Sequence, residues 1–353
     1  MTSDTPFFSS YGKMLVQEPF ALQKGGVLPE VTLRYDTYGK KQKNAVVIFA
    51  PLARGSHLAG VYPPEVQTLL GPFESRTPPM GWVDHAVGPG KAIDTDKFFV
   101  LGANALGGCL GTTGPTSLNP ATSRPYGASF PEITMGDIAR AHALLLDRLE
   151  IERAWVIGWS LGGLQALEFA IAYPERTLGL LALVSSHRPN HFVKQIEALA
   201  SSIISRDPAF SCGDNQEQPP SLQDALLVFY MSAFSRRQLD YILQNRGFES
   251  IVQLASRFSS VLDAVSFLRT MRASAHYDGG PEERLRALAS SPLCKKLVAV
   301  EDDQLYAPEE VERAAMELQA SYSLVQSPFG HLAVTFDKAL ILRFCQEFMK
   351  EAS

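Results

Sequence analysis

The sequence has little cysteine, and its four cysteines are widely spaced: Cys109, Cys212, Cys294 and Cys345. They form no CxxC pair and no spacing typical of a metal site, so we expect reduced thiols, no bound metal and a cytoplasmic location. Long apolar runs are also missing, since the longest, at 178–184, suits a buried strand rather than a bilayer span. The N-terminus lacks the basic-then-apolar pattern of a secretion signal. The sequence therefore predicts no membrane association.

Runs of basic residues are equally absent. The net charge is −5, and no stretch of Lys and Arg is long enough to follow a polyanion, which argues against nucleic acid as a partner. A hydrophobic content of 46% with 20% charged residues is typical of a soluble protein with a sizeable core. The 353 residues suffice for one large domain carrying an insertion, or for two ordinary domains.

Short apolar runs alternate with helical patterns in both end regions of the chain. The runs predicted to be buried strands are 31–35, 45–50, 98–101, 155–158, 178–184 and 297–300. The segments predicted to be helices are 137–149, 161–173, 308–320 and 338–349. Strands that alternate with helices predict an α/β fold with a mainly parallel sheet covered on both faces.

The middle of the chain has a different character. It contains no convincing strand and is predicted to form several helices, at 191–205, 221–245 and 248–275. An all-helical insert between two parts of one sheet is most simply a lid; an independent helical domain is the alternative, but the sheet needs the later strand and helices to be complete. We therefore predict a core domain of residues 1–186 and 293–353 with a helical lid at 187–292.

One motif carries nucleophilic chemistry. A short buried strand runs into Gly158-Trp159-Ser160-Leu161-Gly162, and a helical pattern follows at once. Strand, tight turn and helix form the context in which G-x-S-x-G marks a nucleophile elbow of the α/β-hydrolase fold. The turn raises the Ser160 hydroxyl off the sheet and sets it at a helix N-terminus, where unpaired N–H groups favour a developing oxyanion.

A serine hydroxyl needs a general base, and the base needs an acid that orients it. In this fold the order along the chain is serine, acid, histidine. A predicted strand runs into a cluster of carboxylates, Glu301, Asp302 and Asp303, and spacing alone does not choose among them. His331 follows in a turn-like loop before the final helix, whereas His276 lies inside the insert, so we predict His331 as the base.

The oxyanion hole requires two N–H donors near the serine. The first is expected from Leu161, directly after the nucleophile. The second is expected from the loop after the strand at 45–50, so Leu52 or Ala53 is predicted to supply it.

By these residues the sequence resembles the homoserine O-acetyltransferase family. The similarity covers most of residues 30–185 and returns at 297–336. The stretches that carry it are Arg34–Gly39, Gly88–Lys91, Ile93–Val100, Asn119-Pro120, Pro125–Gly127 and Leu164–Glu168, and above all the glycine-rich Leu106–Pro115.

The resemblance implies a mechanism and places the acid. The family's acid stands where Asp303 is, which selects it from the cluster. The family also implies a helical lid over a deep tunnel, homodimers formed through lid helices, and no permanently bound cofactor. Acetyl-CoA or another acyl-CoA would acylate the serine, and a hydroxyl-bearing acceptor such as homoserine or serine would then take the acyl group.

The sequence departs from the family pattern at three positions expected to touch substrate. Leu332 stands where an acceptor-binding Asp is usual, Phe267 where a lid Tyr is usual, and Arg54 where a small residue is usual. Three hypotheses follow: an O-acyltransferase, which we predict; a carboxylic-ester hydrolase that uses water as acceptor; and a catalytically silent ligand-binding fold. The intact Ser160, Asp303 and His331 argue against the third.

Overall fold

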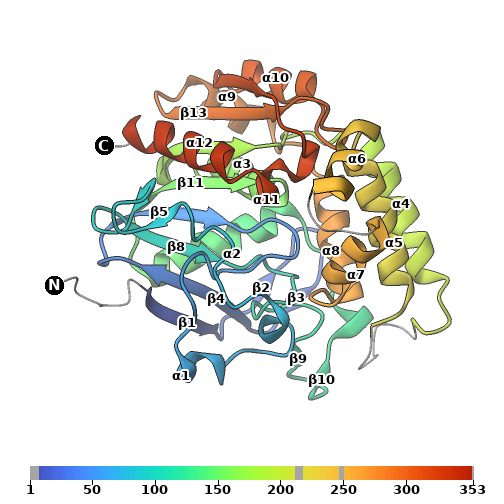
Figure 1. Ribbon diagram of the computed structural model, residues 1–353. Coiled ribbons are helices and arrows are strands. Elements are labelled where there is room, and N and C mark those ends of the chain that lie inside the picture. Colours follow the sequence, from blue (N-terminus) through green and yellow to red (C-terminus); the bar gives the residue numbers. More distant parts are fainter. Residues whose placement is uncertain (1–7, 211–217, 246–249, 352–353) are drawn as a thin grey trace.

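The computed structural model describes residues 8–210, 218–245 and 250–351 and is built on one eight-stranded sheet (Figure 1). The strands lie in the order β1 (Phe8–Val16), β4 (Val31–Tyr38), β8 (Phe99–Ala103), β5 (Asn44–Phe49), β11 (Arg153–Trp159), β12 (Thr177–Leu183), β13 (Cys294–Val300) and β14 (Ser321–Val325). The pairs from β8 to β14 are parallel, and the pairs β1–β4 and β4–β8 are antiparallel. The mainly parallel sheet predicted from the sequence is confirmed.

Burial explains why the sequence revealed some strands and hid others. The central strands are buried along nearly their whole length, and such strands are apolar throughout because helices cover both faces of a parallel sheet. The edge strands β1 and β14 are partly exposed and carry mixed residues. They were not among the predicted strands, because an edge strand needs no continuous apolar run.

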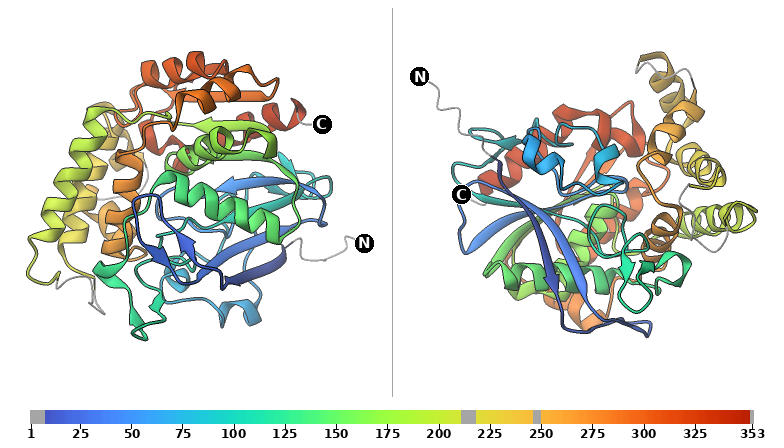
Figure 2. Two further views of the ribbon diagram at one scale, coloured as in Figure 1. Left: turned by 180° about the vertical axis from the view of Figure 1, so that it is seen from behind. Right: turned by 90° about the horizontal axis from the view of Figure 1, so that it is seen from below.

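Helices cover both faces of the sheet. Helices α2 (Met135–Arg148) and α3 (Leu161–Ala172) pack on one face, and α12 (Lys338–Glu351) lies on the other (Figures 1 and 2). Helix α10 (Pro308–Glu317) packs on β13 and β14, and α9 (Glu282–Ser290), which the sequence did not predict, packs on α3. The short elements are β2 (Phe20–Ala21), β3 (Val27–Leu28), β6 (Val87–Gly88), β7 (Ile93–Asp94), β9 (Leu118–Asn119), β10 (Arg124–Pro125), α1 (Pro64–Gln67) and α11 (Ala333–Phe336).

Five helices cluster at one end of the sheet, as Figure 1 shows in yellow-green to orange. They are α4 (His191–Ser205), α5 (Ser221–Ala233), α6 (Arg236–Asn245), α7 (Ile251–Ser259) and α8 (Ala264–Ala275). Helix α4 packs against α5 and α8, and α5 packs against α7. We call α4–α8 the cap helices.

Two long helices predicted in this region are each divided in two. The segment predicted as one helix at 221–245 breaks at Phe234, whose backbone is extended, and Ser235 then starts α6 by exchanging hydrogen bonds with Gln238. In the segment predicted at 248–275, residue 248 lies outside the described residues, and Asp263 caps a new helix by accepting from the Ser266 N–H. Capping side chains therefore override an apolar pattern that continues across both breaks.

Across the described parts of the chain, no single helix is both long and apolar enough to cross a membrane. The pair α7 and α8 passes that test only when joined, and the two helices meet at an angle of 104°.

Candidate active site

Ser160 sits at the junction of β11 and α3 in a backbone conformation that residues with side chains rarely adopt, with φ 55° and ψ −127°. The two glycines of the motif make this turn possible. A Cβ atom on Gly158 would lie 2.1 Å from the Gly162 carbonyl oxygen, and one on Gly162 would lie 2.1 Å from that of Phe49. Only glycine therefore fits on either side of the serine.

Hydrogen bonds from the neighbouring strand hold this turn in place. The Ser160 N–H donates to the Leu183 carbonyl at 3.0 Å, and the Ser185 hydroxyl donates to the Ser160 carbonyl at 2.7 Å. Because Ser160 is bonded through both backbone polar groups, its side chain is free to face the cavity above the sheet.

Three side chains form a connected chain of hydrogen bonds. The Ser160 Oγ lies 2.8 Å from His331 Nε2, and His331 Nδ1 lies 3.0 Å from Asp303 Oδ2. Asp303 and His331 are 2% and 1% exposed, so bulk water does not compete for these bonds. With its Nδ1–H donated to the carboxylate, His331 presents a lone pair on Nε2 to the serine hydroxyl. The structure thus brings together the three residues that the sequence proposed as a triad.

The position of Asp303 distinguishes it from the other two carboxylates of the cluster. Its second oxygen, Oδ1, accepts from the Leu305 and Tyr306 N–H groups at 2.9 and 3.1 Å, which fixes the carboxylate plane. Asp302 instead is exposed and pairs with Arg237 at 3.4 Å. Of the three carboxylates, Asp303 is the one in hydrogen-bonding contact with His331.

The residues proposed as oxyanion donors lie beside the serine. Leu52 and Leu161 both line the cavity that contains Ser160, whereas Ala53, with φ 61°, lines only the neighbouring cavity. Leu161 is the first residue of α3, and an N–H in the first turn of a helix has no partner within that helix. The arrangement favours Leu52 over Ala53 as the second donor, and both assignments stay predictions.

Gln165 connects the two halves of this expected oxyanion hole, a contact that the sequence did not reveal. Its Nε2 donates to the Ala50 carbonyl at 3.1 Å and to the Leu161 carbonyl at 3.3 Å. Its Oε1 lies 2.9 Å from His142 Nε2. Burial lowers the pKa of His142 to about 4, so at neutral pH its ring is uncharged and its Nε2–H donates to the amide oxygen. The amide is thereby held with its nitrogen toward both carbonyls.

A second network fixes the loop that follows Leu52. Arg34, a buried residue of β4, forms ion pairs with Asp36 at 2.9 Å and with Glu74 at 2.8 Å. Asp36 also accepts from the Ser56 hydroxyl at 2.9 Å, and the Tyr38 hydroxyl accepts from the Leu58 N–H at 2.8 Å. Residues of β4 therefore hold the 52–59 loop in place through hydrogen bonds to Ser56 and Leu58.

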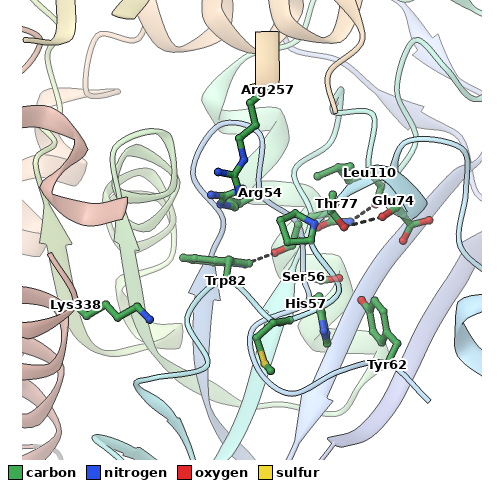
Figure 3. Close-up of a pocket in the computed structure, with 14 residues that line it drawn as sticks. Arg54, Ser56, His57, Tyr62, Glu74, Thr77, Trp82, Leu110, Arg257 and Lys338 are labelled. Atoms are coloured by element: carbon green, nitrogen blue, oxygen red, sulfur yellow. Dashed lines mark hydrogen bonds between the residues drawn. The ribbon is translucent and has the colours of Figure 1, made fainter. Parts of the chain in front are cut away.

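Three cavities lie in a row around this loop. The serine cavity, about 30 Å³, is lined by Ser160, His331 and nine other residues: Leu52, Leu161, Val193, Ile196, Phe229, Met271, Ser274, Leu305 and Tyr306. The loop cavity, about 40 Å³, lies on the other side of Leu52 and Leu161. The outer cavity, about 340 Å³, shares Arg54 with the loop cavity and is drawn in Figure 3. The described residues that line the serine cavity include no Asp, Glu, Lys or Arg.

The three residues proposed to bind substrate are placed differently. Arg54 lines the loop and outer cavities. Leu332 and Phe267 are buried, at 7% and 0% exposed, and neither is among the residues lining the serine cavity. Their role toward substrate stays a prediction.

Within the described residues, no group of three or more His, Cys, Asp and Glu side chains is arranged to hold a metal ion. The site holds a serine hydrogen-bonded to a histidine, and through it to a carboxylate, beside the first turn of α3. That combination suits attack on an acyl carbonyl with formation of an acyl-serine.

Comparison with known proteins places this geometry in context. A family model described as alpha/beta hydrolase fold matches residues 81–210. Homoserine O-acetyltransferase from Thermus thermophilus is 36% identical over 342 residues, which cover 94% of this chain and 90% of that protein.

Solved structures agree with the sequence comparison. Homoserine O-acetyltransferase from Bacillus anthracis superposes with a TM-score of 0.83 at 25% identity, over 96% of this chain and 97% of the other. Esterase E22 gives a TM-score of 0.79 at 23% identity over 96% and 100% of the two chains, a likeness in fold. The predicted α/β-hydrolase fold is confirmed.

Proposed function

This chain belongs to the homoserine O-acetyltransferase family of α/β-hydrolase-fold enzymes, and from that premise we propose how its residues divide the work of acyl transfer. The chain is an enzyme of the acyltransferase type. We propose Ser160 as the nucleophile, His331 as the general base and acid, and Asp303 as the residue that orients His331. The observation that carries the proposal is the hydrogen-bonded chain from Ser160 Oγ through His331 to Asp303, at 2.8 and 3.0 Å.

In the first half-reaction Ser160 Oγ attacks the carbonyl carbon of the acyl donor while His331 Nε2 takes the hydroxyl proton. The oxyanion that forms accepts from the N–H groups of Leu161 and Leu52. His331 then returns the proton to the leaving group as the bond to the carbonyl carbon breaks, leaving an acyl-serine. Asp303 stabilises the imidazolium that exists between the two proton transfers.

In the second half-reaction an acceptor hydroxyl attacks the acyl-serine, again with His331 as base. We infer that the donor is acetyl-CoA or another acyl-CoA, since the relatives are named as acetyltransferases. Homoserine, which the same names give as their substrate, is the first acceptor to test. Donor and acceptor are both small molecules, and the chemistry calls for no permanently bound cofactor.

A second candidate is ester hydrolysis on the same triad. The apolar lining of the serine cavity favours it, because the ammonium and carboxylate of an amino-acid acceptor would find no charged partner among its described residues. Leaving such a charge buried and unpaired costs on the order of several kcal/mol. Water or a neutral alcohol would meet no such penalty.

One assay separates the two. The enzyme is incubated with acetyl-CoA and, separately, with a p-nitrophenyl acyl ester, each with and without homoserine or serine, and Ser160→Ala serves as the blank. Release of free CoA that depends on the acceptor supports transfer. Rapid ester turnover that no amino acid changes would reject transfer in favour of hydrolysis. A Ser160→Ala protein that still acquires an acyl group in mass spectrometry would refute the nucleophile assignment.

We further infer that the cap helices α4–α8 act as a lid and form the interface of a homodimer in the cytoplasm. Large apolar side chains stand exposed on these helices: Phe192, Leu199, Met231 and Val252. Exposed apolar side chains favour association where they form a contiguous patch. The boundary of the lid at 187–292 stays a proposal, and α9, near its end, packs on the core helix α3. Sedimentation equilibrium would give the mass of the assembly.

A further inference from the structure

The outer cavity concentrates positive charge. It is lined by Arg54 from the loop after Leu52, Arg257 from α7 and Lys338 at the start of α12. Figure 3 shows Arg257 reaching from its helix toward Arg54, with Lys338 on the far side of Trp82. The one carboxylate in the lining is Glu74, which Arg34 already engages at 2.8 Å.

Arg54 is the central observation. Among the residues that the structure describes, none makes a hydrogen bond or an ion pair with its guanidinium, which lies over the Phe258 ring, 5.4 Å from the centroid. Burial, and the nearby charge of Arg257, lower the pKa of Arg54. Arg54 is only partly exposed, so its charge is incompletely solvated, and a second cation beside it makes that charge less favourable still. The pair is therefore preorganised for an anion.

The cavity also lies close to the serine, because neighbouring cavities share lining residues. The outer and loop cavities share Arg54, Asn104 and Leu110, and the loop and serine cavities share Leu52 and Leu161. Arg54 follows the proposed oxyanion donor Leu52 by two residues. An anion held at Arg54 would thus belong to a molecule whose other end lies near Ser160.

We propose that Arg54 and Arg257, with Lys338, bind an anionic oxygen group, a carboxylate or a phosphate, of the substrate that acylates Ser160. This inference rests on the proposed function and specifies the chemical class of its substrate. Two sources present this chemistry: a carboxylate at the far end of the acyl chain, or the phosphates of a CoA carrier. Guanidinium groups suit both, because their paired N–H donors match two oxygens at once.

Two pairs of substrates distinguish the sources. The first pair is acetyl-CoA and S-acetyl-N-acetylcysteamine, the same thioester without phosphates. The second pair is mono-p-nitrophenyl adipate and p-nitrophenyl hexanoate, which have six-carbon acyl chains with and without a terminal carboxylate. For each pair the readout is the ratio of kcat/KM for the charged member to that for the neutral member.

The variants are Arg54→Gln and Arg257→Gln, with Arg286→Gln as the matched control on the exposed surface of α9. Arg257 is exposed, so its variant tests the site even where Arg54→Gln fails to fold. We expect both Gln variants to lower the ratio of one pair about tenfold, while Arg54→Lys, which keeps the charge, loses less. A fall in the thioester pair identifies the phosphates, and a fall in the ester pair identifies the acyl carboxylate.

Ratios that stay within about twofold of wild type in both Gln variants, for both pairs, would overturn the proposal. The neutral substrates keep this outcome separate from the proposed function. If wild type turns over the neutral members through Ser160 but shows no charge-dependent change, only the anion site is wrong. If no neutral ester acylates Ser160, the proposed function itself fails.

Discussion

Ser160 shows how one strained residue depends on its neighbours. A residue at φ 55° and ψ −127° costs on the order of 1–3 kcal/mol, which the surrounding structure must offset. Here the offset comes from the bonds to Leu183 and Ser185 and from two glycines that leave the turn room. The strain places a hydroxyl within 2.8 Å of a buried imidazole.

At this scale the carboxylate cluster gives a sharp test. We expect Asp303→Asn to leave the fold intact and to lower kcat about 10³- to 10⁴-fold, because the imidazole loses the partner that sets its tautomer. Asp302→Asn, a matched change one residue away on an exposed side chain, should change kcat by less than about threefold. Steady-state kinetics with a p-nitrophenyl ester checks both. If Asp302→Asn lowers kcat more than Asp303→Asn does, the assignment of Asp303 as the acid is wrong.

Leu332 tests the acceptor side. We expect Leu332→Asp to raise the activity that depends on an amino-acid acceptor, since a carboxylate next to His331 offers an ammonium the partner that the apolar lining lacks. The measurement is free CoA released from acetyl-CoA with and without homoserine. Leu332→Asn, of similar size and uncharged, is the control. Equal behaviour of the two variants would show that charge at this position does not select the acceptor.

At the scale of the element, α3 does more than carry the serine at its first turn. Through Gln165 it also holds the start of the 50–54 loop, so the two proposed oxyanion donors are fixed relative to each other. Electrostatic stabilisation of an oxyanion requires both donors to lie at hydrogen-bonding distance, about 2.7–3.1 Å, from the position that the oxyanion will occupy.

We therefore expect Gln165→Leu to lower kcat by on the order of tenfold or more, with a smaller effect on KM, because the loss falls on the transition state. Urea unfolding measured alongside kinetics separates this effect from lost stability. A folded variant with wild-type kcat would show that the loop keeps its place without this bridge.

The cap helix α6 contacts both loops that carry the proposed acid and base. Gln238 Nε2 donates to the Glu301 carbonyl at 3.2 Å, and a Cβ atom on Gly330, next to His331, would lie 2.4 Å from Gln238 Oε1. The side chain is fully buried. Gln238 therefore contacts the chain two residues before Asp303 and one residue before His331, and it can hold both loops in position.

We expect Gln238→Ala to reduce kcat/KM by on the order of tenfold through misplacement of these loops. Gln244→Ala, on the exposed face of the same helix, is the control and should stay within about twofold of wild type. Both variants are compared with a small and a large p-nitrophenyl ester. Identical kinetics for the two variants would remove α6 from the support of the site.

At the scale of the whole molecule, a buried histidine links pH to stability. The pKa of His142 is about 4 in the folded protein and 6.5 without burial. Between pH 6.5 and about pH 4, His142 is therefore protonated in the unfolded chain but not in the folded protein. Stability that is present above pH 6.5 is lost as the pH falls toward about 4. Two and a half pKa units correspond to about 3 kcal/mol.

We expect urea unfolding to show a free energy of unfolding that declines between pH 6.5 and pH 4, with a shallower decline in His142→Gln. The difference between the two slopes should approach one proton. Parallel curves for the two proteins would mean that His142 is protonated in the folded state as readily as in the unfolded chain.

Local sequence determined those parts of this protein that depend on neighbours in the chain. The buried strands, the elbow around Ser160 and the helix that follows it were predictable, because burial on both faces and a tight turn impose residue types on short stretches. The position of His331 followed from chain order. The sequence did not predict the edge strands β1 and β14, because a partly buried strand needs no continuous apolar run. It also did not predict the breaks within the cap helices, because the capping residues there interrupt no apolar pattern.

Only the tertiary structure decided which distant groups meet. Spacing alone left three carboxylates open and the family resemblance selected Asp303; the structure shows the reason, since the turn after β13 brings Asp303 rather than Asp302 to His331. Nothing local predicted that Gln165 would bridge two loops, or that Arg54 and Arg257, far apart in the chain, would face one cavity. These contacts arise because parallel strands end at one edge of the sheet, where their loops and the cap helices come together. A local sequence pattern does not indicate which of these distant segments will be neighbours.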